Sequence, residues 1–125
     1  MTNGINVLNL LLSPERFSSM EGEYMGVKAS TSENNQELTI SIDGRFDFSA
    51  HQEFRDAYED IGATVKTYIV DLGATSYLDS SALGMLLLLR DHAGGDSSDV
   101  RIANCNPDVR KILTISNFEQ LFNIQ

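Results

Sequence analysis

The chain has 125 residues, 42% of them hydrophobic and 22% charged, which is the size and composition of one globular domain. Its 18 acidic and 9 basic residues give a formal charge of −9, which argues against a nucleic-acid partner and against docking on an anionic membrane surface. A single cysteine, Cys105, and two histidines exclude an internal disulfide and a conventional structural zinc site, so neither a metal nor a cofactor is expected.

Residues 1–24 differ in pattern from the rest of the chain. The segment NVLNLLL, residues 6–12, fits a short amphipathic helix or strand that Pro14 interrupts. Arg16 is the first basic residue and follows this apolar part, which therefore lacks the charged start of a signal peptide. No apolar run approaches the ~20 residues of a membrane helix. We expect a cytoplasmic protein in which residues 1–24 are an extension of undefined structure and residues 25–125 form one domain.

A hairpin is predicted at the start of that domain. In ELTISIDG the apolar residues Leu38, Ile40 and Ile42 alternate with polar ones, which indicates a half-buried strand that ends at Gly44. The polar turn STSENNQ precedes this strand, and MGVKAST, residues 25–31, is predicted to be its hairpin partner.

The segment RFDFSAHQEFRDAYEDIG, residues 45–62, is predicted to be a helix. Ser49, followed three residues later by Gln52, has the spacing of a capping box. Apolar residues recur at helical spacing at Phe54, Ala57, Tyr58 and Ile61. Phe46 and Phe48 flank the predicted cap, and we expect one to pack on the helix as a hydrophobic staple and the other to be exposed to a partner.

Strands and helices then alternate. KTYIVDLG, residues 66–73, fits a central strand covered by its neighbours. SSALGMLLLLRDHAGG, residues 80–95, is predicted to be the second helix. One side of this helix is traced by Leu83, Leu86, Leu87 and Arg90. Leu83 and Met85 are expected to include exposed apolar contacts.

The rest of the chain completes the alternation. SSDVRIANC, residues 97–105, is predicted to be a strand, and NPDVRKILTIS, residues 106–116, a third helix capped by Asn106 with Pro107 at its first position. FEQLFNIQ, residues 118–125, is predicted to form a short turn and a last strand. This order predicts an α/β fold with a mostly parallel central sheet of four or five strands, an N-terminal hairpin and three to four helices mainly on one face.

The segment DSSALG places Asp79, Ser80 and Ser81 between a predicted strand and a predicted helix. One of these side chains suffices to cap the helix, which would leave the Ser81 hydroxyl uncommitted in the first turn. A phosphate there would add about −1.5 to −2 charges, which the helix start tolerates, so that the charge would act on a partner rather than on the fold. The residues alone are compatible with two interpretations of this segment: a helix cap only, or a phosphorylation switch at Ser81.

Enzyme chemistry finds little support in the sequence. There is no G-x-S-x-G nucleophile elbow and no G-x-x-x-x-G-K phosphate loop. His51 and His92, the only imidazoles, fall on predicted helices and are expected to face solvent. We therefore predict no catalytic residue and do not expect an enzyme.

Three segments together resemble the STAS domain of bacterial anti-sigma factor antagonists. VDLGATSYLDSSALGMLLLL, residues 70–89, is similar to the family's strand ending in D-L, short turn and D-S-S-G-L-G helix start. IDGRFDFSAHQEFRDAY resembles its earlier G-x-x-D turn and helix, and RIANCNPDVRKILTISNFEQLFNI its last strand, helix and tail. The likeness covers residues 37–124. Ala82 stands where the family often has glycine. Alanine is the better helix former by about 1 kcal/mol, so we expect a stiffer helix start here.

The resemblance implies a regulator. A partner serine kinase, itself an anti-sigma factor, would phosphorylate the position that matches Ser81, with Ser80 as the second choice. The unmodified form would bind this kinase and free a sigma factor, the phosphorylated form would be released, and a metal-dependent serine phosphatase would reverse the change. Related proteins steer motility and biofilm regulators. The alternative is a signalling-complex scaffold or sensor-binding module, in which Ser81 is only a cap.

For the regulator we expect a monomer with its partner-binding residues gathered at one end of the sheet, where α/β folds place ligands. These residues are Gly44, Arg45, Phe46, Asp47, Asp79, Ser80, Ser81, Ala82 and Leu83. Residues 104–108 are expected to join the same cluster.

Overall fold

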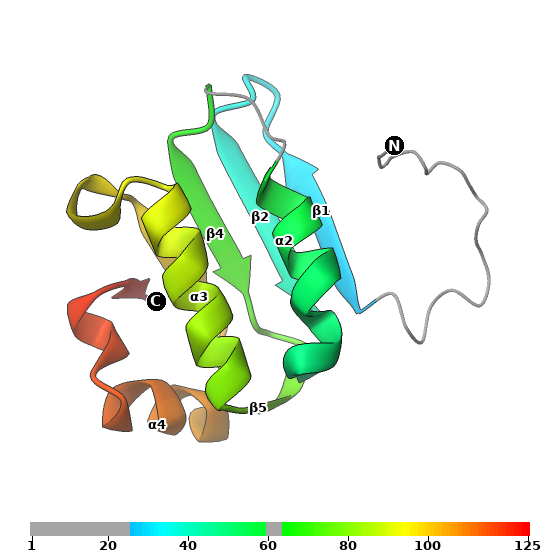
Figure 1. Ribbon diagram of the computed structural model, residues 1–125, viewed down its shortest axis with the longest axis vertical. Helices are drawn as coiled ribbons and strands as arrows, with labels where there is room; N and C mark the ends of the chain where they lie inside the picture. The colour runs from blue at the N-terminus through cyan, green and yellow to red at the C-terminus, as the bar shows by residue number, and fades with distance from the viewer. Residues whose placement is uncertain (1–25, 60–63) are drawn as a thin grey trace.

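The computed structural model of the chain describes residues 26–59 and 64–125 (Figure 1). The predicted N-terminal extension and the end of the first predicted helix, with Ile61, lie outside the described residues.

A five-stranded sheet forms the centre of the fold, in the order β1-β2-β4-β6-β7. Its strands are β1 Val27–Thr31, β2 Glu37–Ile42, β4 Thr67–Asp71, β6 Val100–Ala103 and β7 Asn123–Ile124. β1 runs antiparallel to β2, whereas β2, β4, β6 and β7 are parallel to their neighbours. The predicted α/β fold, with a mostly parallel sheet and a hairpin at its start, is confirmed.

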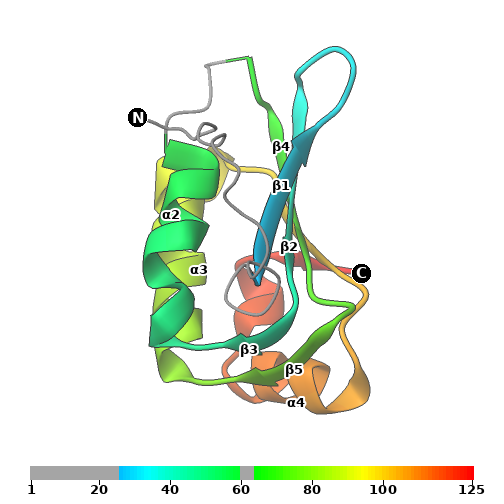
Figure 2. The same ribbon diagram turned by 90° about the vertical axis from the view of Figure 1, so that its right-hand side faces the viewer.

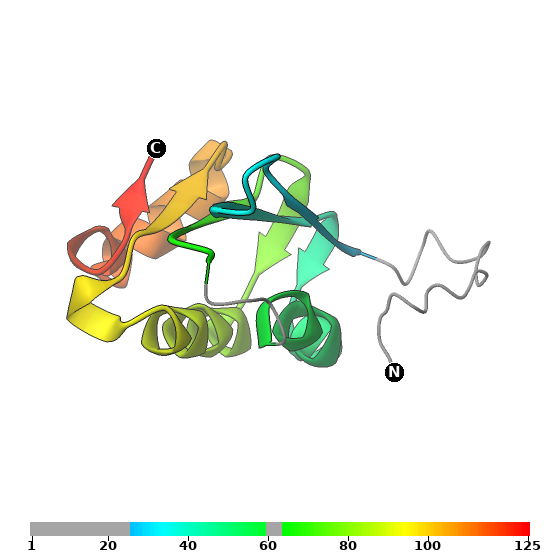
Figure 3. The same cartoon turned by 90° about the horizontal axis from the view of Figure 1, so that it is seen from above.

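The helices α2 (His51–Glu59) and α3 (Ser80–His92) lie side by side on one face of this sheet (Figures 1 and 3). Because the steps from β2 to β4 and from β4 to β6 go in the same direction, their right-handed crossovers place both helices on the same face. A third helix, α4 (Pro107–Ile115), contacts β5 (Thr75–Leu78) at the end of the sheet (Figure 2). Among the described residues, the 3-10 helices are η2 Phe48–Ala50, η3 Gly95–Ser97 and η4 Phe118–Gln120.

The core lies between the sheet and these helices. Leu38, Ile40 and Ile42 of β2 are buried, as the alternation predicted. In β4 only alternate residues are buried, among them Val70, whereas Ile69 on the other face is half-buried. The expectation that β4 is covered by its neighbours is therefore wrong on one face, because no described helix lies there (Figure 3).

α3 buries a different side from the predicted one. Its buried residues are Ala82, Met85, Leu86 and Leu89. Leu87, which belongs to the side traced from the sequence, is 42% exposed, and Leu88 is 55% exposed. Met85, predicted to offer an exposed contact, is buried. The run MLLLL has no polar residue to break it, so the 3.6-residue period cannot select one face within it.

A second, two-stranded sheet was not predicted. Here β3 (Gly44–Phe46) pairs in parallel with β5. The start of the predicted helix at residues 45–62 is therefore wrong, because Arg45 and Phe46 are in a strand, and β5 lies where only a turn was predicted. Gly44 takes a positive φ of 87°, which glycine adopts without strain, and its N–H donates to the carbonyl of Ala74 at 2.9 Å. The buried Thr75 hydroxyl donates to the carbonyl of Ile42 at 2.7 Å, which ties the small sheet to the end of β2.

Candidate functional site

The small sheet brings two predicted segments of the site together. In its register Arg45 lies opposite Tyr77, and Phe46 lies opposite Leu78. The Arg45 guanidinium stacks over the Tyr77 ring at 4.1 Å from its centroid. The next residue after each strand is an aspartate, and each aspartate begins a helical segment, so the starts of α2 and α3 are neighbours at one end of the fold (Figure 2).

Asp79 caps α3 and holds Ser81. Its Oδ1 accepts hydrogen bonds from the N–H of Ser81 at 3.0 Å, the N–H of Ala82 at 3.2 Å and the hydroxyl of Ser81 at 2.6 Å. The predicted cap at this helix is confirmed, but the expectation of an uncommitted Ser81 hydroxyl is wrong. The Ser81 side chain is half-buried and Ser80 is exposed, so the hydroxyl is at the surface rather than in the core.

Asp47 repeats this arrangement at the other helix start. Its Oδ1 accepts from the N–H of Ser49 at 3.0 Å and from the Ser49 hydroxyl at 2.5 Å, and its Oδ2 accepts from Arg45 Nε at 3.0 Å. The predicted capping box at Ser49 is therefore wrong, because Asp47 is the cap and η2 intervenes before α2. The D-x-S triplets DFS at residues 47–49 and DSS at residues 79–81, each just before a predicted helix or within its start, are the sequence signal that could have revealed this pairing.

Both capping aspartates are held in their charged form. The Ser49 hydroxyl, followed by Arg45, lowers the pKa of Asp47 below its usual range, and the Ser81 hydroxyl is the largest cause that lowers the pKa of Asp79. In the opposite direction, burial and, to a smaller extent, the charge of Asp47 raise the pKa of Asp79, as expected of two carboxylates that lie near one another.

These shifts predict a loss of stability in acid. Because the folded-state pKa lies below the unfolded value, the ionised Asp79 stabilises the fold above that value, and the contribution disappears as the pH falls through the folded-state pKa. We expect the urea midpoint to fall between pH 7 and pH 3. The change should be smaller in Asp79→Asn, because asparagine caps helices without titrating. An identical pH dependence in both proteins would contradict this assignment.

The predicted partner-binding residues divide into exposed and buried ones. Arg45 and Ser80 are exposed, whereas Leu83 is half-buried. Phe46 and Ala82 are completely buried, so their side chains cannot contact a partner in this structure and that part of the prediction is wrong. Other apolar side chains at this end of the fold and along α3 are exposed instead.

Phe48 is the exposed member of the predicted phenylalanine pair. It is 71% exposed and stacks on the His51 ring at 5.3 Å between centroids, whereas Phe46 packs on Phe54 in the core. Leu87 and Leu88 add apolar surface further along α3. Sequence reasoning did not identify these two leucines as exposed.

The start of α4 is attached to the same end of the fold. Asn106 caps α4 through its Oδ1, which accepts from the N–H of Val109 at 2.8 Å, as predicted. Its Nδ2 donates to the carbonyl of Thr75 in β5 at 3.0 Å. Residues 104–108 therefore adjoin the small sheet. Cys105 is half-buried, and burial raises the pKa of its thiol.

The described residues show neither a candidate metal site nor a candidate membrane-spanning helix. Across residues 26–59 and 64–125, no group of three or more His, Cys, Asp or Glu side chains is placed to hold a metal ion. In the same part of the chain, no helix has the length and apolar character needed to cross a bilayer.

Comparison with known proteins places the chain in a family. The family described as "Mlab, STAS domain" matches residues 29–123. The chain belongs to the STAS-domain family. A STAS-domain containing protein of Pseudomonas aeruginosa (strain UCBPP-PA14) is 65% identical over 100 residues, which cover 80% of this chain and 99% of that protein.

Solved structures share the fold at lower identity. The anti-sigma factor antagonist SpoIIAA in its unphosphorylated form has a TM-score of 0.60 and 18% identity, covering 79% of this chain and 86% of SpoIIAA. The phosphorylated Bacillus SpoIIAA gives 0.62 and 19%, covering 79% and 90%. A serine-to-glutamate variant of RsbS from Moorella thermoacetica gives 0.64 and 17%, covering 79% and 85%. STAS domains are regulatory binding modules, so this chain is a binding module and not an enzyme.

Proposed function

We propose that this STAS domain is an anti-sigma factor antagonist whose binding to a serine kinase, itself an anti-sigma factor, is switched off by phosphorylation of Ser81. The observation that carries the proposal is the position of the Ser81 hydroxyl. It lies at the surface in the first turn of α3, and Asp79 fixes its direction through a 2.6 Å hydrogen bond. Such an oxygen is accessible to a kinase without unfolding the domain.

Charge explains how the modification would act. A phosphate brings about −1.5 to −2 charges to a position next to Asp79 and near Asp47, both of which are ionised at neutral pH. Repulsion from these carboxylates would turn the phosphate outward, toward any protein docked on the helix start. The fold would be kept, which agrees with the similar TM-scores of this chain to the two forms of SpoIIAA.

The proposed contact surface combines the exposed side chains at this end. Arg45, Phe48 and Ser80 surround the helix starts, and Leu87 and Leu88 extend the apolar part along α3. A metal-dependent serine phosphatase would restore the binding form, and control of motility or biofilm formation would be the output. A monomeric cytoplasmic domain that begins near residue 25 is part of the same proposal.

A scaffold without a phosphorylation switch is the second candidate, because the Ser81 hydroxyl already has a structural role in the cap of α3. The test is incubation with ATP and the cognate serine kinase, followed by intact-mass analysis. We expect one added phosphate on the wild type and on Ser80→Ala, and none on Ser81→Ala.

Ser49→Ala is the matched control, since Ser49 makes the same contact to Asp47 at the neighbouring helix start. It should still be phosphorylated at Ser81. If Ser80→Ala alone loses the phosphate, the assigned position is off by one residue. If no variant and no wild-type protein is modified, the switch is refuted and the scaffold remains.

A further inference from the structure

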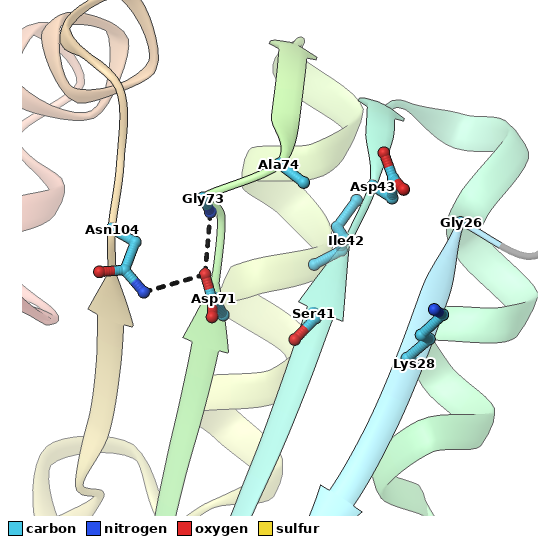
Figure 4. Close-up of a pocket in the computed structure, with 9 residues that line it drawn as sticks. All are labelled: Gly26, Lys28, Ser41, Ile42, Asp43, Asp71, Gly73, Ala74 and Asn104. Carbon is cyan, nitrogen blue, oxygen red and sulfur yellow. Dashed lines mark hydrogen bonds between the residues drawn. The ribbon is translucent and has the colours of Figure 1, made fainter.

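The face of the main sheet opposite α2 and α3 presents a row of polar side chains. In the strand register Lys28 of β1 lies opposite Ser41 of β2, and Ser41 lies opposite Asp71 of β4. Side chains alternate between the two faces of a strand, so these residues face away from the core residues Ile42 and Val70. Figure 4 shows the three polar side chains on the same side of three adjacent strands.

This row borders an open depression of about 490 Å³ at the carboxyl ends of β2 and β4. Small residues keep the depression open: Gly26, Gly73 and Ala74 line it beside the polar side chains (Figure 4). At Gly26 any Cβ would lie 2.8 Å from the carbonyl oxygen of Asp43, so a larger residue is excluded there. The volume is within the range of small-molecule sites.

The Asp71 carboxylate is held in a fixed orientation beside the depression. Its Oδ1 accepts from the N–H of Gly73 at 2.9 Å and from Asn104 Nδ2 at 3.2 Å (Figure 4). Asn104 has a φ of 64°, a left-handed conformation that few residues other than glycine adopt. Among the described residues, Asp71 Oδ2 has no hydrogen bond, and Lys28 forms no ion pair with Asp71 or with Asp43.

We propose that this depression binds a small zwitterion of the free amino-acid class. The ligand's ammonium group would bind Asp71 Oδ2, with the exposed Asp43 adding negative charge at the rim, and its carboxylate would bind Lys28 and the Ser41 hydroxyl. Adjacent strands lie about 4.8 Å apart, so the backbones at Lys28 and Asp71 are about 10 Å apart. The Lys28 side chain is long and flexible, so its ammonium group can meet the carboxylate of an amino acid whose own ammonium group forms a charge-assisted hydrogen bond with Asp71.

The charges around the depression favour a zwitterion over a simple anion or a dication. Two carboxylates would repel a simple anion, whereas Lys28 would repel a dication. A zwitterion satisfies both signs at once, and the remaining volume leaves room for a side chain. This site lies on the opposite face from α2 and α3, so the inference does not depend on the phosphorylation switch.

The test is an NMR titration of the full ¹⁵N-labelled chain with glycine and with each free L-amino acid separately. We expect at least one amino acid to shift the amides of Gly26, Gly73 and Asn104 saturably, with a Kd of about 1 mM or tighter. Sodium acetate and methylammonium chloride carry only one of the two charges and should give no saturable shift. Equal shifts from either of them, or none from any amino acid, would overturn the proposal.

Two variants locate the binding. Asp71→Asn keeps the Oδ1 acceptor for Gly73 and removes the charge, and Lys28→Gln removes the opposite charge. Each should weaken binding at least about tenfold. Lys111→Gln, which removes an exposed charge from α4, should bind as the wild type does. Unchanged affinity in both pocket variants would place the ligand elsewhere and refute this site.

Discussion

Replacing Ser81 with aspartate is expected to weaken binding of the kinase partner at least about 100-fold, which corresponds to about 3 kcal/mol, while the fold is kept. The new carboxylate would stand beside Asp79, whose Oδ1 lies 2.6 Å from the Ser81 hydroxyl in the wild type. Two like charges that must be desolvated in one interface are costly, and no basic residue at the start of α3 offsets them. Calorimetric titration would measure the affinity, and circular dichroism would monitor the fold.

Ser97→Asp is the control for this charge. Ser97 is exposed in η3, beyond the opposite end of α3, so the same added charge should leave the affinity within about twofold of the wild type. If Ser81→Asp disturbs the fold, the enzymatically phosphorylated wild type can replace it in the same titration. Full affinity in that sample would show that the start of α3 is not part of the interface.

Replacing Phe46 with alanine is expected to lower the free energy of unfolding by about 3–5 kcal/mol, the usual cost of removing a buried phenylalanine. The Phe46 side chain is completely buried and its ring packs on Phe54 at 5.2 Å between centroids. It belongs to β3, so the cavity would open where the small sheet meets α2. Urea denaturation monitored by circular dichroism would measure the change.

Phe48→Ala removes the same side chain two residues away, at a position 71% exposed. It should change the free energy of unfolding by no more than about 0.5 kcal/mol. The same variant should weaken partner binding if Phe48 belongs to the proposed contact surface. Equal losses of stability in the two variants would contradict the assignment of Phe46 to the core.

Most of the fold could be predicted because its long elements repeat a clear pattern. The alternation of Leu38, Ile40 and Ile42 fixed the buried face of β2, and Asn106 with Pro107 marked the start of α4. The short strands β3 and β5 could not be found in this way. With three and four residues they contain too few alternations to give a periodic signal, and their pairing is a contact between distant segments.

The candidate site was predicted in its location more accurately than in its contacts. Parallel strands end at the same edge, so the clustering of the helix starts at Asp47 and Asp79 followed from the predicted topology. The hydrogen bond from Ser81 to Asp79 did not, because rotation of the serine side chain is decided by local geometry that spacing does not encode. Similarly, the uniform run MLLLL could not distinguish the buried Met85 from the exposed Leu88.

The pairing of β3 with β5 has a consequence for how the state of α3 can be monitored. It brings Asp47, on a segment that leads into α2, close enough for its charge to raise the pKa of Asp79. Electrostatic coupling of this kind is mutual, so any negative group gained at the start of α3 must raise the pKa of Asp47 in turn. The Asp47 carboxyl is thus an internal reporter, readable by ¹³C chemical shift, of a modification made on a different helix.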